Sequence, residues 1–77
     1  MTKNQLQLIA DLLIKAHRND ITRDKDWWHG IEGHDFNIHD GERANGWYTI
    51  NVYPHSEETG TDYSTWVTLP FVRIKKA

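Results

Sequence analysis

Hydrophobic positions near the N-terminus recur with the spacing of an amphipathic helix. The residues that repeat every three or four positions are Leu6, Ile9, Ala10 and Leu13. Thr2 and Gln5 form a capping-box pattern at the start of this segment. His17 and Arg18 suit its last turn, where the helix dipole favours positive charge. The pattern therefore predicts a helix that begins after Thr2 and ends near residue 19.

The apolar stripe of this helix is wider than packing against one sheet requires. Leu8, Leu12 and Ile14 fall outside the main stripe. One interpretation is that the following loop, with Trp27 and Trp28, wraps over them. The other is that Leu8 and Leu12 contact a partner or a second copy of the chain, which would make a homodimer.

The period then changes from helical spacing to alternation, which is typical of strands. The alternating segments are residues 35–39, 47–54 and 63–76. Asn45-Gly46 is a strong hairpin signal, Pro54 is expected to stop the second strand, and Pro70 indicates an edge or a bulge in the third. The region from Asp20 to Asp35 is interpreted as a connection with bends at its glycines.

These elements predict one α+β domain over residues 1–77, with an N-terminal helix packed on a three-stranded antiparallel β-meander. The inner face is expected to hold Phe36, Ile38, Tyr48, Ile50, Val52, Val67 and Leu69. The outer face would then hold Asn37, His39, Trp47, Thr49, Asn51, Tyr53, Trp66 and Thr68. Its aromatic residues have a structural and a functional interpretation. They could form cross-strand pairs, or be buried under the Trp28 loop, and so serve the fold alone. Alternatively, they form a recognition surface.

Charge separates the middle of the chain from its ends. Residues 26–65 carry eight acidic side chains and one basic one, whereas residues 1–25 and 66–77 have net charges of +2 and +3. The acidic residues that flank the outer face are Asp40, Glu42, Glu57, Glu58 and Asp62. An aromatic face with acidic neighbours favours a protein partner with a basic surface and disfavours duplex DNA.

Composition narrows the classes of function further. The chain has no cysteine, and we find no apolar run that would serve as a signal peptide or membrane span, so a cytoplasmic location is expected. The sequence contains neither a nucleophile motif nor a glycine-rich phosphate loop, so no enzymatic activity and no cofactor are expected. His29, His34 and His39 have a spacing that matches no metal signature, although a site made of these histidines and nearby carboxylates is one alternative. Single-stranded nucleic acid stacked on sheet aromatics is another.

In size, lack of cysteine and predicted layout, the chain resembles small accessory proteins of phages and other mobile elements. The resemblance implies an interaction protein that inhibits or modulates a larger host assembly, such as one that handles nucleic acid. The predicted partner-binding residues are Trp47, Asn51, Tyr53 and Trp66, with Asp40, Glu42, Glu57 and Glu58 at the rim. Trp27 and Trp28 are the second choice, and one of the two is expected in the core.

Overall fold

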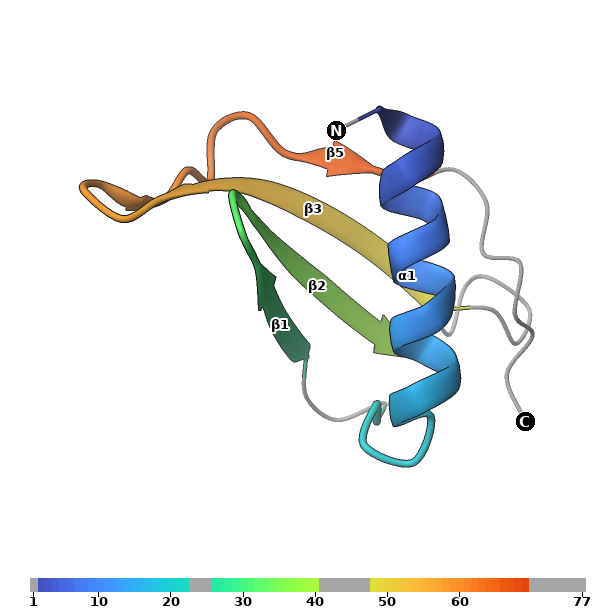
Figure 1. The fold of residues 1–77 in the computed structure, drawn as a ribbon. Coiled ribbons are helices and arrows are strands. Elements are labelled where there is room, and N and C mark those ends of the chain that lie inside the picture. Colours follow the sequence, from blue (N-terminus) through green and yellow to red (C-terminus); the bar gives the residue numbers. More distant parts are fainter. Residues whose placement is uncertain (1, 23–25, 41–47, 70–77) are drawn as a thin grey trace.

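One helix and five strands make up the described part of the chain. The computed structural model describes residues 2–22, 26–40 and 48–69 (Figure 1). In chain order the elements are α1 (Lys3–His17), β1 (Trp27–Ile31), β2 (His34–Asp40), β3 (Tyr48–Ser56), β4 (Gly60–Thr61) and β5 (Val67–Thr68). The predicted α+β class is confirmed, because a single N-terminal helix accompanies an antiparallel sheet.

The start of α1 follows the predicted capping box. The Gln5 backbone N–H donates to Thr2 Oγ1 at 3.2 Å, and the Thr2 backbone N–H donates to Gln5 Oε1 at 2.7 Å. These two bonds satisfy donors that have no partner within the helix, which favours initiation at this point. At the other end, Lys15 and His17 lie in the last turn, where the helix dipole favours basic side chains.

The buried face of α1 is rotated relative to the prediction. The buried residues are Leu6, Gln7, Ala10, Leu13 and Ile14. Ile14 was expected outside the main stripe, and that expectation was wrong. Gln7 is accommodated because its side-chain amide donates to Asp11 at 3.0 Å. Leu8 and Leu12 lie on the opposite side of the helix and are 55% and 66% exposed, so no described loop covers them.

The sheet has more strands than the predicted meander. Its order is β1-β2-β3-β4, and β5 also pairs with β3. The predicted connection between the helix and the first strand contains β1, which pairs antiparallel with β2. Ile31 pairs with His34, so Glu32 and Gly33 form a two-residue turn. Gly33 has φ of 82°, a backbone conformation that side chains with a β-carbon seldom adopt.

β3 is the central strand and continues through Pro54, where it was expected to end. β5 pairs with it at Asn51 and Val52, whereas β4 pairs with it at His55 and Ser56. Pro54 lies between these two pairings, and its carbonyl accepts from the Asp62 N–H at 2.8 Å. The N–H that proline lacks would point to the same edge, where the ladder is interrupted, so the strand tolerates Pro54.

The predicted third strand is present in its described part only as the short strand β5. Within residues 63–69 only Val67 and Thr68 are in a strand. Pro70 and the rest of that predicted strand lie outside the described residues, as do the predicted hairpin residues Asn45 and Gly46. The antiparallel pairing of β2 with β3 agrees with a hairpin between them.

The core lies between α1 and the inner face of the sheet (Figure 1). Its sheet residues are Phe36, Ile38, Tyr48, Ile50, Val52 and Leu69, as predicted. Val67 was expected among them but is 38% exposed, because β5 is a short strand at the edge of the sheet. Trp27 and Ile31 of β1 pack against the core from the same side.

Among the residues that the structure describes, no helix is long and apolar enough to cross a membrane.

Candidate binding surface

The outer face of the sheet is set by the register of β1, β2, β3 and β5. Trp28 lies opposite Asn37, Asn37 opposite Asn51, and Asn51 opposite Thr68. Side chains in such a row share one face because successive residues of a strand alternate. The Thr68 hydroxyl donates to Asn51 Oδ1 at 2.8 Å and links β3 to β5 on this face.

Four aromatic rings gather on the outer face. The outer aromatic cluster consists of Trp28, Tyr53, Tyr63 and Trp66. The Tyr53 ring centroid lies 5.5 Å from that of Trp28, 5.4 Å from that of Tyr63 and 6.2 Å from that of Trp66. Trp28 and Tyr63 meet edge to face at 6.4 Å. Pairs of this kind contribute about 0.5–1.5 kcal/mol each, so the cluster has a structural role as well as an exposed surface.

Contact among the rings does not bury them. Trp28 is 45% exposed, Trp66 52% and Tyr63 64%, whereas Tyr53 at the centre is half-buried. Folded chains of this size seldom leave several large aromatic side chains exposed side by side. Where such a patch occurs, it usually marks an interaction site.

Asn37 lies on the same face but is buried. Only 4% of it is exposed, and its Nδ2 has no hydrogen-bond partner in the structure. The alternation of β2 predicted its direction, but not its burial beneath neighbouring side chains. A buried amide donor without a partner costs about 1–3 kcal/mol, so the packing of the outer face carries an energetic cost that its aromatic pairs offset.

Asp62 shapes the loop that carries Tyr63 and Trp66. Its carboxylate accepts from the Ser64 hydroxyl at 2.6 Å, the Ser64 backbone N–H at 2.9 Å and the Thr65 hydroxyl at 2.8 Å. The hydroxyl of Ser64, then its backbone N–H and the hydroxyl of Thr65, hold the pKa of Asp62 below its ordinary value. Asp62 therefore stays ionised and keeps the loop folded across the range in which most proteins work.

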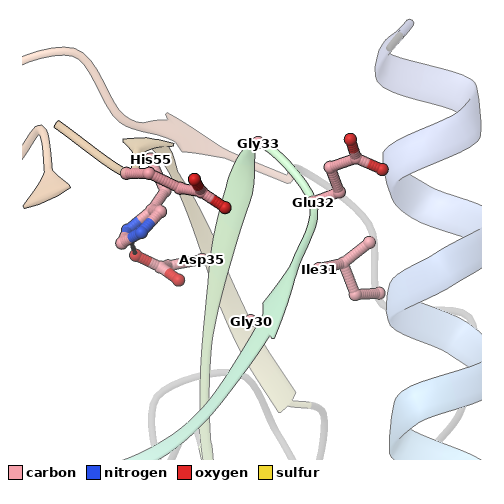
Figure 2. Close-up of a pocket in the computed structure, with 7 residues that line it drawn as sticks. Gly30, Ile31, Glu32, Gly33, Asp35 and His55 are labelled. Atoms are coloured by element: carbon pink, nitrogen blue, oxygen red, sulfur yellow. Dashed lines mark hydrogen bonds and ion pairs between the residues drawn. The ribbon is translucent and has the colours of Figure 1, made fainter.

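A hollow of about 430 Å³ lies at the β1–β2 turn (Figure 2). It is lined by Gly30, Ile31, Glu32, Gly33, Asp35, His55 and Glu57. Figure 2 shows the Asp35 carboxylate and the His55 ring pointing toward one another, whereas Glu32 and Ile31 extend to the other side of the turn. His55 Nδ1 lies 2.9 Å from Asp35 Oδ2, which also accepts from the Thr61 hydroxyl. Asp35 thus ties β2 to β3 and β4.

The hollow adjoins the outer aromatic cluster through the register. Asp35 lies directly opposite Gly30 on β1 and Tyr53 on β3. Trp28 precedes Gly30 by two residues and so lies on the same face of β1. The hollow and the cluster therefore form one continuous surface.

The described side chains on this surface carry net negative charge. Its acidic residues are Glu32, Asp35, Glu57, Glu58 and Asp62. The lysines and arginines of the described residues are Lys3, Lys15 and Arg18, and all three lie on or directly after α1. Because α1 covers the inner face, these cations are separated from the outer face by the sheet (Figure 1).

The predicted site residues fall into three groups. Trp28, Tyr53 and Trp66 come together in the outer aromatic cluster, with Asn51 nearby on the same face. Glu57 and Glu58 are exposed in the β3–β4 turn. The others cannot be placed: Trp47 and Glu42 lie outside the described residues, and so does the side chain of Asp40.

The histidines of the middle segment do not converge. By alternation, His29 and His34 point to the inner face and His39 to the outer face. His29 lies beside Trp27 and His17 instead, with ring centroids 5.6 Å and 6.3 Å away. Within the described ranges, no three His, Asp or Glu side chains are arranged to hold a metal ion.

Sequence reasoning missed part of this surface. Tyr63 was placed in a strand, although it lies in a loop that returns over Tyr53. The Asp35–His55 contact joins residues 20 positions apart, and no local pattern indicates it. Gly30 was interpreted as a bend in the connection, whereas it lies inside β1. A glycine within a strand often marks a close approach or an open space, which is the signal that was available.

Comparison with protein-family models, with curated proteins and with solved structures found no match to this chain.

Proposed function

We propose that the chain is a non-enzymatic interaction protein whose outer aromatic cluster docks onto a protein partner with a basic surface. The observation that carries the proposal is the exposure of Trp28, Tyr63 and Trp66 side by side around Tyr53. Tryptophan and tyrosine dominate binding energy at interfaces because they bury large areas and lose few rotamers.

The charge of the surface supports a basic partner. The carboxylates of Glu57, Glu58 and Asp62 lie in the exposed segment between β3 and β5, close in sequence to Tyr63 and Trp66. Complementary charge speeds encounter and selects against acidic proteins. The same carboxylates would repel the phosphates of single-stranded nucleic acid, whose binding depends on nearby lysine and arginine. A protein partner is therefore favoured over an oligonucleotide.

Occupation of a basic site on a larger assembly would make the chain a stoichiometric inhibitor or modulator. Such a role needs surface area and charge rather than catalytic groups. The exposed Leu8 and Leu12 lie on the far side of the molecule, so self-association through them would leave the outer aromatic cluster open to the partner.

Selection of displayed random peptides on the immobilised chain tests the proposal. We expect the enriched peptides to be rich in lysine and arginine. Calorimetry should show their affinity falling by at least about tenfold, or about 1.4 kcal/mol, in the double variant Trp28→Ala/Trp66→Ala.

The matched control is Leu8→Ala/Leu12→Ala, which removes two exposed apolar side chains from the opposite side and should leave affinity unchanged. Circular dichroism melts of both variants establish that they fold. Enriched peptides that are not basic, or that lose affinity only in the control, would overturn the proposal. Binding of a labelled oligothymidine at low salt that is lost in Trp28→Ala/Trp66→Ala would assign the surface to nucleic acid instead.

A further inference from the structure

We propose that the hollow at the β1–β2 turn binds the guanidinium group of an arginine on the protein partner. The inference rests on the proposed function and adds the side chain that the surface selects. It is carried by the shape of the hollow, by the direction of the Asp35 carboxylate and by the adjacent aromatic rings.

The hollow exists because a side chain is missing from the outer face of β1. Trp28 and residue 30 are consecutive outward positions on that strand, and residue 30 is glycine. A β-carbon at this position would lie 3.4 Å from Asp35 Oδ1. Gly30 does not have the positive φ of Gly33 or Gly60. The backbone therefore does not require glycine there, and space above the strand is the remaining physical reason for it.

Asp35 presents an acceptor to that space. Its Oδ2 is engaged by His55 and Thr61, which fix the orientation of the carboxylate. Oδ1 is directed over Gly30, and only 18% of the side chain is exposed. A carboxylate has about four acceptor sites, so a donor that entered the hollow would find Oδ1 already positioned. Glu32 and Glu57 also line the hollow and add negative charge.

The neighbouring rings favour arginine over lysine. Tyr53 lies directly opposite Asp35, and Trp28 lies on the same face of β1. A guanidinium is planar, stacks on aromatic faces and donates two parallel hydrogen bonds to a carboxylate, whereas an ammonium is a strongly hydrated point charge. An arginine bound at Asp35 could thus pack against the cluster at the same time.

Titration followed by amide NMR tests this assignment, with N-acetyl-arginine amide as the probe. The measurement uses the full chain at physiological ionic strength, where charges more than about 8 Å apart are largely screened. We expect the largest shifts at the amides of Gly30 and Gly33. N-acetyl-citrulline amide has the same shape without the charge and should produce no saturable shift, and N-acetyl-lysine amide should bind at least threefold more weakly.

Two variants and one control locate the site. Gly30→Ala places a methyl group 3.4 Å from Asp35 Oδ1 without changing charge, so it obstructs the approach of a donor to that oxygen. Glu57→Gln removes charge without adding bulk, and each variant should weaken the arginine probe at least threefold. Asp20→Asn removes one carboxylate charge just after the end of α1, outside the lining of the hollow, and should leave the affinity unchanged.

Equal binding of the lysine or citrulline probe, or equal loss in Glu57→Gln and Asp20→Asn, would overturn the assignment. If the arginine probe fails while selected basic peptides still require Trp28 and Trp66, the proposed function stands and the inference alone is wrong. If those peptides also fail, both are wrong.

Discussion

Strand alternation places buried side chains on the inner face of the sheet and exposed aromatic side chains on the outer face. Two adjacent tryptophans of β1 show this difference most directly. Trp27 packs against the core beside His17, whereas Trp28 is 45% exposed among the tyrosines of the outer face. The inner face is covered by α1 and its central side chains are fully buried. The comparison teaches that hydrophobic side chains on this sheet stabilise the fold most where the helix covers them.

The largest effect is expected from the inner face. Phe36 is fully buried at the centre of the core, and Phe36→Ala should destabilise the chain by about 3–5 kcal/mol because it leaves a cavity. Small domains have about 5 kcal/mol of stability in total. Urea titration followed by circular dichroism should show an unfolding midpoint shifted to low denaturant or no folded baseline at all. A midpoint close to that of the unaltered chain would mean that the core is not where the structure places it.

A smaller and sharper contrast is expected between the adjacent tryptophans. Trp27→Ala should cost about 2–3 kcal/mol, less than a fully buried aromatic side chain. Trp28→Ala removes ring contacts with Tyr53 and Tyr63 and should cost about 1 kcal/mol. The two variants differ by one position in the same strand, so each is the other's control for strand propensity. Equal losses in thermal unfolding would contradict the assignment of the two side chains to different faces.

The smallest effect is a local response to acid at the outer face. The hydrogen bonds from Ser64 and Thr65 lower the pKa of Asp62 in the folded chain. Their stabilisation is therefore complete above the unfolded pKa of about 3.9 and is lost as the pH falls through the lower folded value. Below that pH, the NMR signals of Ser64 and Thr65 should move toward random-coil positions.

Asp62→Ala should show the same random-coil signals at neutral pH and no further change in acid. Unchanged signals of the original chain down to the lowest pH at which it stays folded would show that other contacts hold the loop.

Much of the inner half of the fold could be predicted because local chemistry determines it. Thr2 and Gln5 specify the start of α1 by themselves. Phe36, Ile38, Ile50 and Val52 alternate with polar residues, which is the pattern that one covered face requires. The rotation of α1 that buries Ile14 and Gln7 could not be predicted, because the sheet, and not the helix, decides which arc is covered.

The outer half was less predictable because its side chains meet through the pairing of distant segments and not through a local sequence pattern. β1 has a tryptophan on each face and a glycine inside it, so no alternation identifies it as a strand. The hollow depends on Asp35 and His55, which only the paired strands bring together. The direction of Tyr53 and Trp66 followed from strand alternation, whereas the approach of Tyr63 depends on a loop held by Asp62.

The two-residue turn at Glu32 and Gly33 has a consequence for how β1 finds its alignment. A slip of one residue would turn Trp28 toward the core in place of Trp27 and move Ile31 away from the core. The short turn, with Gly33 in a conformation that few other residues accept, allows Ile31 to meet only His34. The backbone conformation of one glycine thus helps to fix the register of β1 against β2. A longer or more flexible turn would permit a register in which the inward and outward side chains of β1 are exchanged.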